Sequence, residues 1–63
     1  MTTSEALVEL DSAAVAIRHN AGKALQRWES LTAEERDRIM MELRHDFQDG
    51  LKSVQVLSGE VSA

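Results

Sequence analysis

The stretch W-E-S-L-T-A-E-E, residues 28–35, separates two halves of the chain that carry the same kind of apolar pattern. Thr32 and Glu35 have the spacing of a capping box, in which the threonine hydroxyl accepts from the Glu35 amide and the Glu35 carboxylate accepts from the Thr32 amide. Glu34, Glu35 and Asp37 also place negative charge at the positive end of the helix that follows. This stretch therefore predicts a turn, with a helix beginning at about residue 33.

On each side of the turn, apolar or small residues recur at alternating spacings of three and four, the heptad pattern of coiled coils and packed helices. The first stripe is Leu7, Leu10, Ala14, Ile17, Ala21, Ala24, Trp28 and Leu31, and the second is Met40, Leu43, Phe47, Gly50, Val54, Leu57 and Val61. A chain reversal at the turn would place small residues against large ones, pairing Ala24 with Leu43, Ala21 with Phe47, Ile17 with Gly50, Ala14 with Val54, and Leu10 with Leu57. We therefore expect an all-α fold, an antiparallel two-helix hairpin.

The chain of 63 residues is short enough to form one helical-hairpin domain. The expected elements are a first helix at about 4–29, a turn at 30–32, a second helix at about 33–57 and a frayed tail at 58–63. Thr2 and Glu5 repeat the capping-box spacing at the start of the first helix, although Ser4 is an equally suitable cap. Asp49-Gly50 is a turn signal that competes with the heptad, so whether the second helix continues past Gly50 stays open.

Other apolar residues lie outside the two stripes and widen the apolar surface toward that of a helix bundle. A domain of this size rarely gains more than about 3–5 kcal/mol from its own core, and the chain has no cysteine for a disulfide. We therefore expect the hairpin to be half of a four-helix bundle, most simply a homodimer, although a different protein partner would leave the same pattern. The expected interface residues are Val15, Leu25, Trp28, Ile39 and Leu51.

The residue types that carry catalysis or metal binding do not form a recognisable site. Glu42 and His45 have the Glu-x-x-His spacing of di-iron bundles, but with Met40 and Phe47 in the core both would lie on the outer face. The serines lack a nucleophile-elbow context, and no glycine-rich phosphate loop is present. We expect no catalytic residue, metal site or cofactor, and interpret the chain as a non-enzymatic protein-interaction or regulatory module.

Composition indicates a small acidic protein of the cytoplasm. The formal net charge of −4 disfavours general binding to nucleic acid. No apolar run approaches the roughly eighteen residues of a membrane-spanning helix, and the N-terminal residues lack the basic start and apolar run of a signal peptide. We therefore expect protein partners and no membrane association.

The turn L-T-A-E-E, residues 31–35, followed by Ile39 and Leu43, is similar to the plan of the Rop family, small two-helix RNA-binding proteins that dimerise into four-helix bundles. The chain length and the layered stripes are also similar, and the likeness covers the turn and the first half of the second helix. It implies an alternative function, a dimeric RNA-binding regulator that uses the basic face of the first helix. The candidate RNA-binding residues are Asn20, Lys23 and Arg27.

Overall fold

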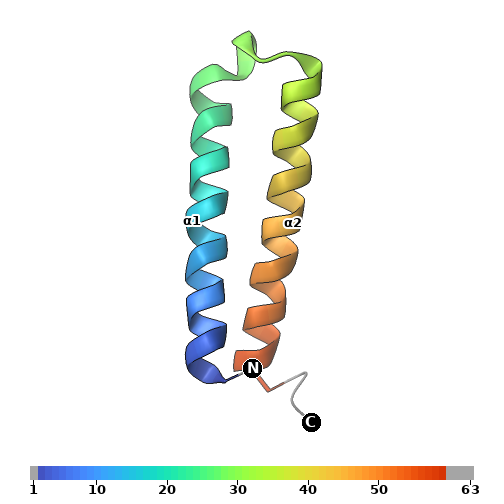
Figure 1. The fold of residues 1–63 in the computed structure, drawn as a ribbon. Helices are drawn as coiled ribbons and strands as arrows, with labels where there is room; N and C mark the ends of the chain where they lie inside the picture. The colour runs from blue at the N-terminus through green and yellow to red at the C-terminus, as the bar shows by residue number, and fades with distance from the viewer. Residues whose placement is uncertain (1, 60–63) are drawn as a thin grey trace.

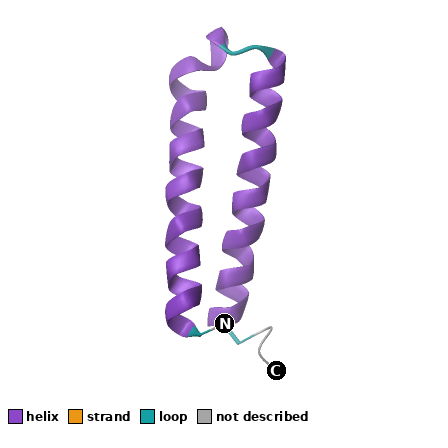
Figure 2. Ribbon diagram, in the orientation of Figure 1, coloured by secondary structure: helices purple, strands orange, loops and turns teal. Residues whose placement is uncertain are grey.

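Two long helices lie side by side and antiparallel in the computed structural model, which describes residues 2–59 (Figure 1). Helix α1 spans Thr3–Arg27 and helix α2 spans Ala33–Leu57. The short 3-10 helix η1, Trp28–Ser30, lies at the turn between them. Residues 2–59 contain no strand (Figure 2). The predicted all-α hairpin is therefore confirmed.

Both helices begin with the capping box that the sequence predicts. At α1, Thr2 Oγ1 accepts from the Glu5 amide at 3.1 Å, and a Glu5 carboxylate oxygen accepts from the Thr2 amide at 3.0 Å. At α2, Thr32 and Glu35 make the same pair of hydrogen bonds, at 3.1 and 2.9 Å. These bonds satisfy amides that have no partner inside the helix, and they make Thr2, rather than Ser4, the cap of α1.

The first helix ends earlier than the predicted residue 29. Helix α1 stops at Arg27, and residues 28–30 tighten into η1, so the connection begins earlier than the predicted turn at 30–32. The Leu31 amide donates to the carbonyl oxygens of Arg27 at 3.0 Å and Trp28 at 3.3 Å. Such bonds commonly tighten the last turn of a helix and satisfy carbonyls that would otherwise lack a partner.

The second helix continues through Gly50 and ends at Leu57, so the heptad outweighs the turn signal at Asp49-Gly50. Ser58 follows as the C-cap, and Gly59 has φ 80°, the left-handed conformation that commonly ends a helix. Of the predicted tail, residues 60–63 lie outside the described part of the chain, as does Val61 of the second stripe.

The sides of the helices that face each other are rotated from the predicted stripes. The buried residues of this seam are Ala6, Ala13, Asn20, Ile39, Gly50 and Ser53. Leu10, Ile17, Ala24 and Leu43 of the predicted stripes are half-buried. Leu31 is half-buried as well, and the other described stripe positions outside the seam are exposed, namely Leu7, Ala14, Ala21, Trp28, Met40, Phe47, Val54 and Leu57. Small side chains in the seam let the helices approach closely, whereas methionine and phenylalanine there would hold them apart.

The register of the hairpin also differs from the predicted layers. A methyl group built on Gly50 would lie 3.7 Å from the Ala13 Cβ and 3.8 Å from Leu10 Cδ1, which places Gly50 opposite these residues rather than opposite Ile17. The predicted pairing of Ile17 with Gly50 is wrong by about one helical turn. The physical reason is the turn, which reverses the chain nearer to Leu31 than the predicted layers require.

Candidate interaction surface

One side of the hairpin is covered by exposed apolar and small side chains from both helices. This apolar face consists of Leu7, Ala14, Ala21, Leu25 and Trp28 from the first half of the chain and Met40, Phe47, Leu51 and Val54 from α2. Leu25 is 88% exposed and Phe47 is 60% exposed. The α-helical members each come directly after a buried or half-buried position, a rotation of about 100° around the helix. Because the helices are antiparallel, this rotation turns toward the same side of the pair on both.

The opposite side of the hairpin is polar. Near the turn, a hollow between the helices is lined by Lys23, Arg27, Glu35, Arg38 and Glu42 together with Asn20, Leu31 and Ile39. Toward the open end, a second hollow is lined by Glu9, Ser12, Ala13, Asp46 and Asp49. The hairpin thus has one apolar face and an opposite face that is mostly polar, although Ala16 and Met41 line a third hollow there. A soluble monomer rarely exposes a large contiguous apolar patch, so such a patch indicates an interaction surface.

Trp28 and Arg36 meet at the turn end of the apolar face. The Arg36 guanidinium donates to the Trp28 carbonyl oxygen from Nε at 2.9 Å and from Nη2 at 2.5 Å. Its central carbon also lies 4.9 Å from the centroid of the Trp28 ring, a cation–π contact. The ring is 38% exposed. Arg36 therefore links α2 to η1 and holds the tryptophan at the edge of the apolar face.

Three of the five predicted interface residues lie on the apolar face, namely Leu25, Trp28 and Leu51. Ile39 does not, because it is only 7% exposed and belongs to the seam, so its prediction as an outward-facing anchor is wrong. Val15 is 62% exposed but lies on the outer side of α1, beside Gly22. Its position follows from the rotation of the seam, since it comes two residues after Ala13 and points away from α2.

Four large members of the apolar face, Leu7, Met40, Phe47 and Val54, were assigned by the sequence pattern to the contact between the helices. Leu7, Met40 and Val54 each lie one position after a buried seam residue, and Phe47 lies one position after the half-buried Asp46. A second heptad beginning at Ala6, offset by one residue from the first, is the signal that identifies them. Two adjacent heptads on one helix are typical of a helix that packs against two neighbours.

The predicted RNA-binding residues do not form a uniformly basic surface. Lys23 and Arg27 are exposed and lie at the turn half of the polar face, where α2 adds Arg38. Glu35 and Glu42 line the same hollow and reduce its net charge. Asn20 is only 7% exposed and belongs to the seam, so its prediction as an exposed contact for RNA is wrong.

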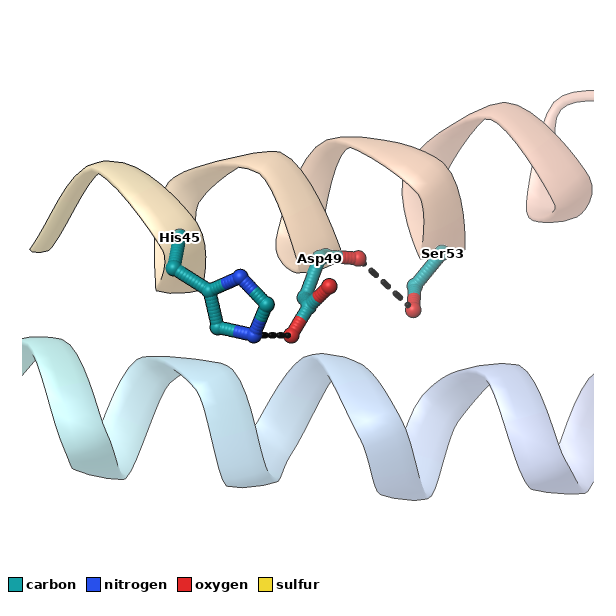
Figure 3. Close-up of polar contacts among 3 residues, drawn as sticks. All are labelled: His45, Asp49 and Ser53. Atoms are coloured by element: carbon teal, nitrogen blue, oxygen red, sulfur yellow. Dashed lines mark hydrogen bonds and ion pairs between the residues drawn. The ribbon is translucent and has the colours of Figure 1, made fainter. Parts of the chain in front are cut away.

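The polar contacts along α2 are local. His45 Nε2 lies 3.3 Å from Asp49 Oδ2, and the Ser53 hydroxyl donates to the Asp49 carbonyl oxygen at 3.3 Å (Figure 3). Both side chains of the ion pair are well exposed, so the pair contributes only a few tenths of a kcal/mol. Residues 2–59 contain no group of three or more histidine, cysteine or acidic side chains placed to hold a metal ion.

Neither helix of the described residues is long and apolar enough to cross a membrane. No family model matches the chain, and searches of curated proteins and of solved structures give no significant match.

Proposed function

We propose that this chain is a small non-enzymatic protein-interaction module that acts by burying its apolar face, and that it assembles as a homodimer into a four-helix bundle. The observation that supports this most strongly is the imbalance between the two sides of the helices. Among residues 2–59, the buried apolar residues are only Ala6, Ala13 and Ile39. The larger apolar side chains Phe47, Met40 and Leu25 remain exposed.

These exposed side chains are large, so burying them would stabilise the protein. Fully burying a leucine, methionine or phenylalanine stabilises a fold by about 1.5–3 kcal/mol, whereas an alanine contributes much less. The apolar face therefore holds potential stabilisation that the contact between α1 and α2 leaves unused. A chain this small without disulfides needs such an additional source, and oligomerisation supplies it.

A second copy is the simplest partner because a two-fold axis in the apolar face brings the same surface of each copy together. The charged residues nearest the face, Asp11, Arg18 and Arg44, are exposed and share the heptad positions of Leu25 and Leu51, which form the outer margins of the face. They can stay in water when the centre of the face is buried, as the polar rim of a protein interface does.

A matched pair of substitutions tests this proposal. Phe47 and Met41 are both exposed on α2, at 60% and 71%, but Met41 is turned away from the apolar face. An isolated hairpin would tolerate Phe47→Glu and Met41→Glu alike. We expect Phe47→Glu to abolish the dimer at micromolar concentration and Met41→Glu to leave it intact, as measured by sedimentation equilibrium together with circular dichroism.

Two results would contradict the proposal. One is a wild-type chain that is folded and monomeric at concentrations of hundreds of micromolar. The other is a dimer that responds equally to Phe47→Glu and Met41→Glu.

We do not propose RNA binding, because the acidic side chains of Glu35 and Glu42 lie among Lys23 and Arg27. A titration of structured RNA at low salt provides the comparison. Binding that weakens steeply with salt and is lost on replacing Lys23 and Arg27 together would favour the RNA-binding alternative.

A further inference from the structure

We infer that the two copies of the dimer lie with their turns at the same end of the bundle, so that α1 of each copy packs on α2 of the other. This inference rests on the proposed homodimer and specifies how the second copy occupies the apolar face. It follows from the distribution of small and large side chains between the two helices.

The register of the hairpin places a small residue of α1 beside a large residue of α2 at successive levels of the apolar face. Ala13 and Asp46 line one hollow of the polar face, so the next residues along each helix, Ala14 and Phe47, share that level. One level nearer the turn, Asn20 and Met41 line another hollow. Ala21 and Met40, which neighbour them in the chain, therefore share this second level.

The apolar face therefore carries small side chains along the middle of α1 and large side chains along the middle of α2. The small side chains are those of Ala14 and Ala21, and the large ones are those of Phe47 and Met40. Leu7 and Val54, toward the open end, are more similar in size. Such a surface packs well against a second copy only if the small side chains of one copy face the large side chains of the other.

A two-fold axis parallel to the helices meets this condition. It leaves every residue at its own level and places α1 of one copy against α2 of the other, so that Ala14 meets Phe47 and Ala21 meets Met40 across the interface. Small residues then face large ones at both levels, which fills space at native density with evenly spaced helices. The two Trp28–Arg36 contacts lie at the same end of this bundle.

A two-fold axis perpendicular to the helices gives the other arrangement, with the turns at opposite ends. In that case α1 packs on α1 and α2 packs on α2. Alanines then face alanines and leave unfilled space, while Phe47 and Met40 crowd each other, and both defects destabilise a core. The same apolar face therefore discriminates between the two arrangements.

The absence of cysteine from the chain makes a direct distance measurement possible. Ser30→Cys introduces a single labelling position at the turn, and Ser58→Cys introduces one at the open end. Pulsed electron–electron double resonance between nitroxides on the two copies measures each separation. With the turns together, equivalent positions lie diagonally across the bundle, about 1.4 interhelical spacings apart, so both variants give an inter-chain distance between nitroxides on the order of 20 Å once the label side chains are included.

The outcomes separate this inference from the homodimer itself. Inter-chain distances approaching the 46 Å length of the hairpin for both variants would overturn the same-end arrangement while leaving the dimer in place. No inter-chain distance, with monomers by sedimentation, would overturn the dimer and this inference with it. Agreement between the two labelling positions shows that neither label has rearranged the bundle.

Discussion

The two helical glycines lie in different surroundings. No atom that a side chain could meet lies within 4 Å of a methyl group built on Gly22, and the same methyl group on Gly50 makes ordinary contacts with Ala13 and Leu10 at 3.7 and 3.8 Å. Neither position has the positive φ that would require glycine. Both glycines therefore lower helix stability without a steric reason inside the hairpin.

We expect Gly22→Ala and Gly50→Ala each to raise the free energy of unfolding by about 1 kcal/mol, because alanine favours the helix. Gly50→Leu should lower it, since a larger side chain would push α1 and α2 apart. Thermal unfolding followed by circular dichroism at a fixed protein concentration checks all three. A loss of stability in Gly50→Ala would mean that the helices approach more closely than the contacts of Gly50 indicate.

Arg36 makes the main side-chain contact across the turn, and lysine cannot replace it. A lysine keeps the positive charge but lacks the planar group that both donates two hydrogen bonds and stacks on an indole. We expect Arg36→Lys to cost about 1–2 kcal/mol of stability and to shift the Trp28 fluorescence emission to longer wavelength. Arg44→Lys, at an exposed position of α2, is the matched control. Equal behaviour of the two variants would remove Arg36 from this role.

The sequence predicts contacts between residues close in the chain better than contacts across the turn. Thr32 and Glu35 could be paired from spacing alone, because a capping box is confined to one helical turn. The contact between Trp28 and Arg36 could not, because it depends on how η1 directs the end of α1.

At the scale of the helices, the sequence predicts where each helix begins and ends, but not which side of it faces the other helix. The start of both helices and the end of α2 follow from caps and periodicity. The choice of seam does not, because Leu7 and Ala6 each begin a heptad that includes Leu10 and Ile17. Hydrophobicity favours the heptad with leucine, whereas close packing of two helices favours the one with alanine. The sequence therefore identifies apolar positions without deciding which neighbour each contacts.

The capping boxes make the start of each helix sensitive to acid. Hydrogen bonds from the backbone amide and the side chain of Thr32 lower the pKa of Glu35 from its ordinary value of 4.5, and Thr2 lowers the pKa of Glu5 in the same way. A carboxyl whose pKa is lower in the folded state contributes stability that is fully present above its unfolded pKa. That contribution is lost as the pH falls through the folded pKa.

We expect the melting temperature to fall when the pH is lowered from neutral to well below 4.5, the ordinary pKa of these carboxyls. Glu35→Gln can keep the capping hydrogen bond but cannot titrate. This variant should therefore lose less of its melting temperature over the same pH range. Melting curves of the wild type and Glu35→Gln across that range provide the measurement, and identical slopes would exclude Glu35 as a source of the acid sensitivity.

At the scale of the whole molecule, the sequence predicts that two helices of this composition carry more apolar surface than one contact between them can bury. The excess is present in the structure, but it is distributed differently from the prediction. Leu25 and Leu51 lie on the apolar face as expected, whereas Ile39 and Phe47 exchange their predicted roles. The identity of a partner depends on complementarity between two surfaces, and one chain's periodicity describes only one of them.

The single turn also determines the order in which the hairpin assembles. Each contact between α1 and α2 closes a loop that grows with distance from η1, and the entropy cost of closing a loop rises with its length. The contact of Trp28 with Arg36 closes one of the shortest loops, and the fully buried Ala6 and Ser53 lie far from the turn. We therefore expect folding to proceed from the turn toward the open end of the hairpin, and local opening to begin at the open end. Backbone amides near Ala6 should exchange with solvent faster than those near Ile39, although both residues are buried.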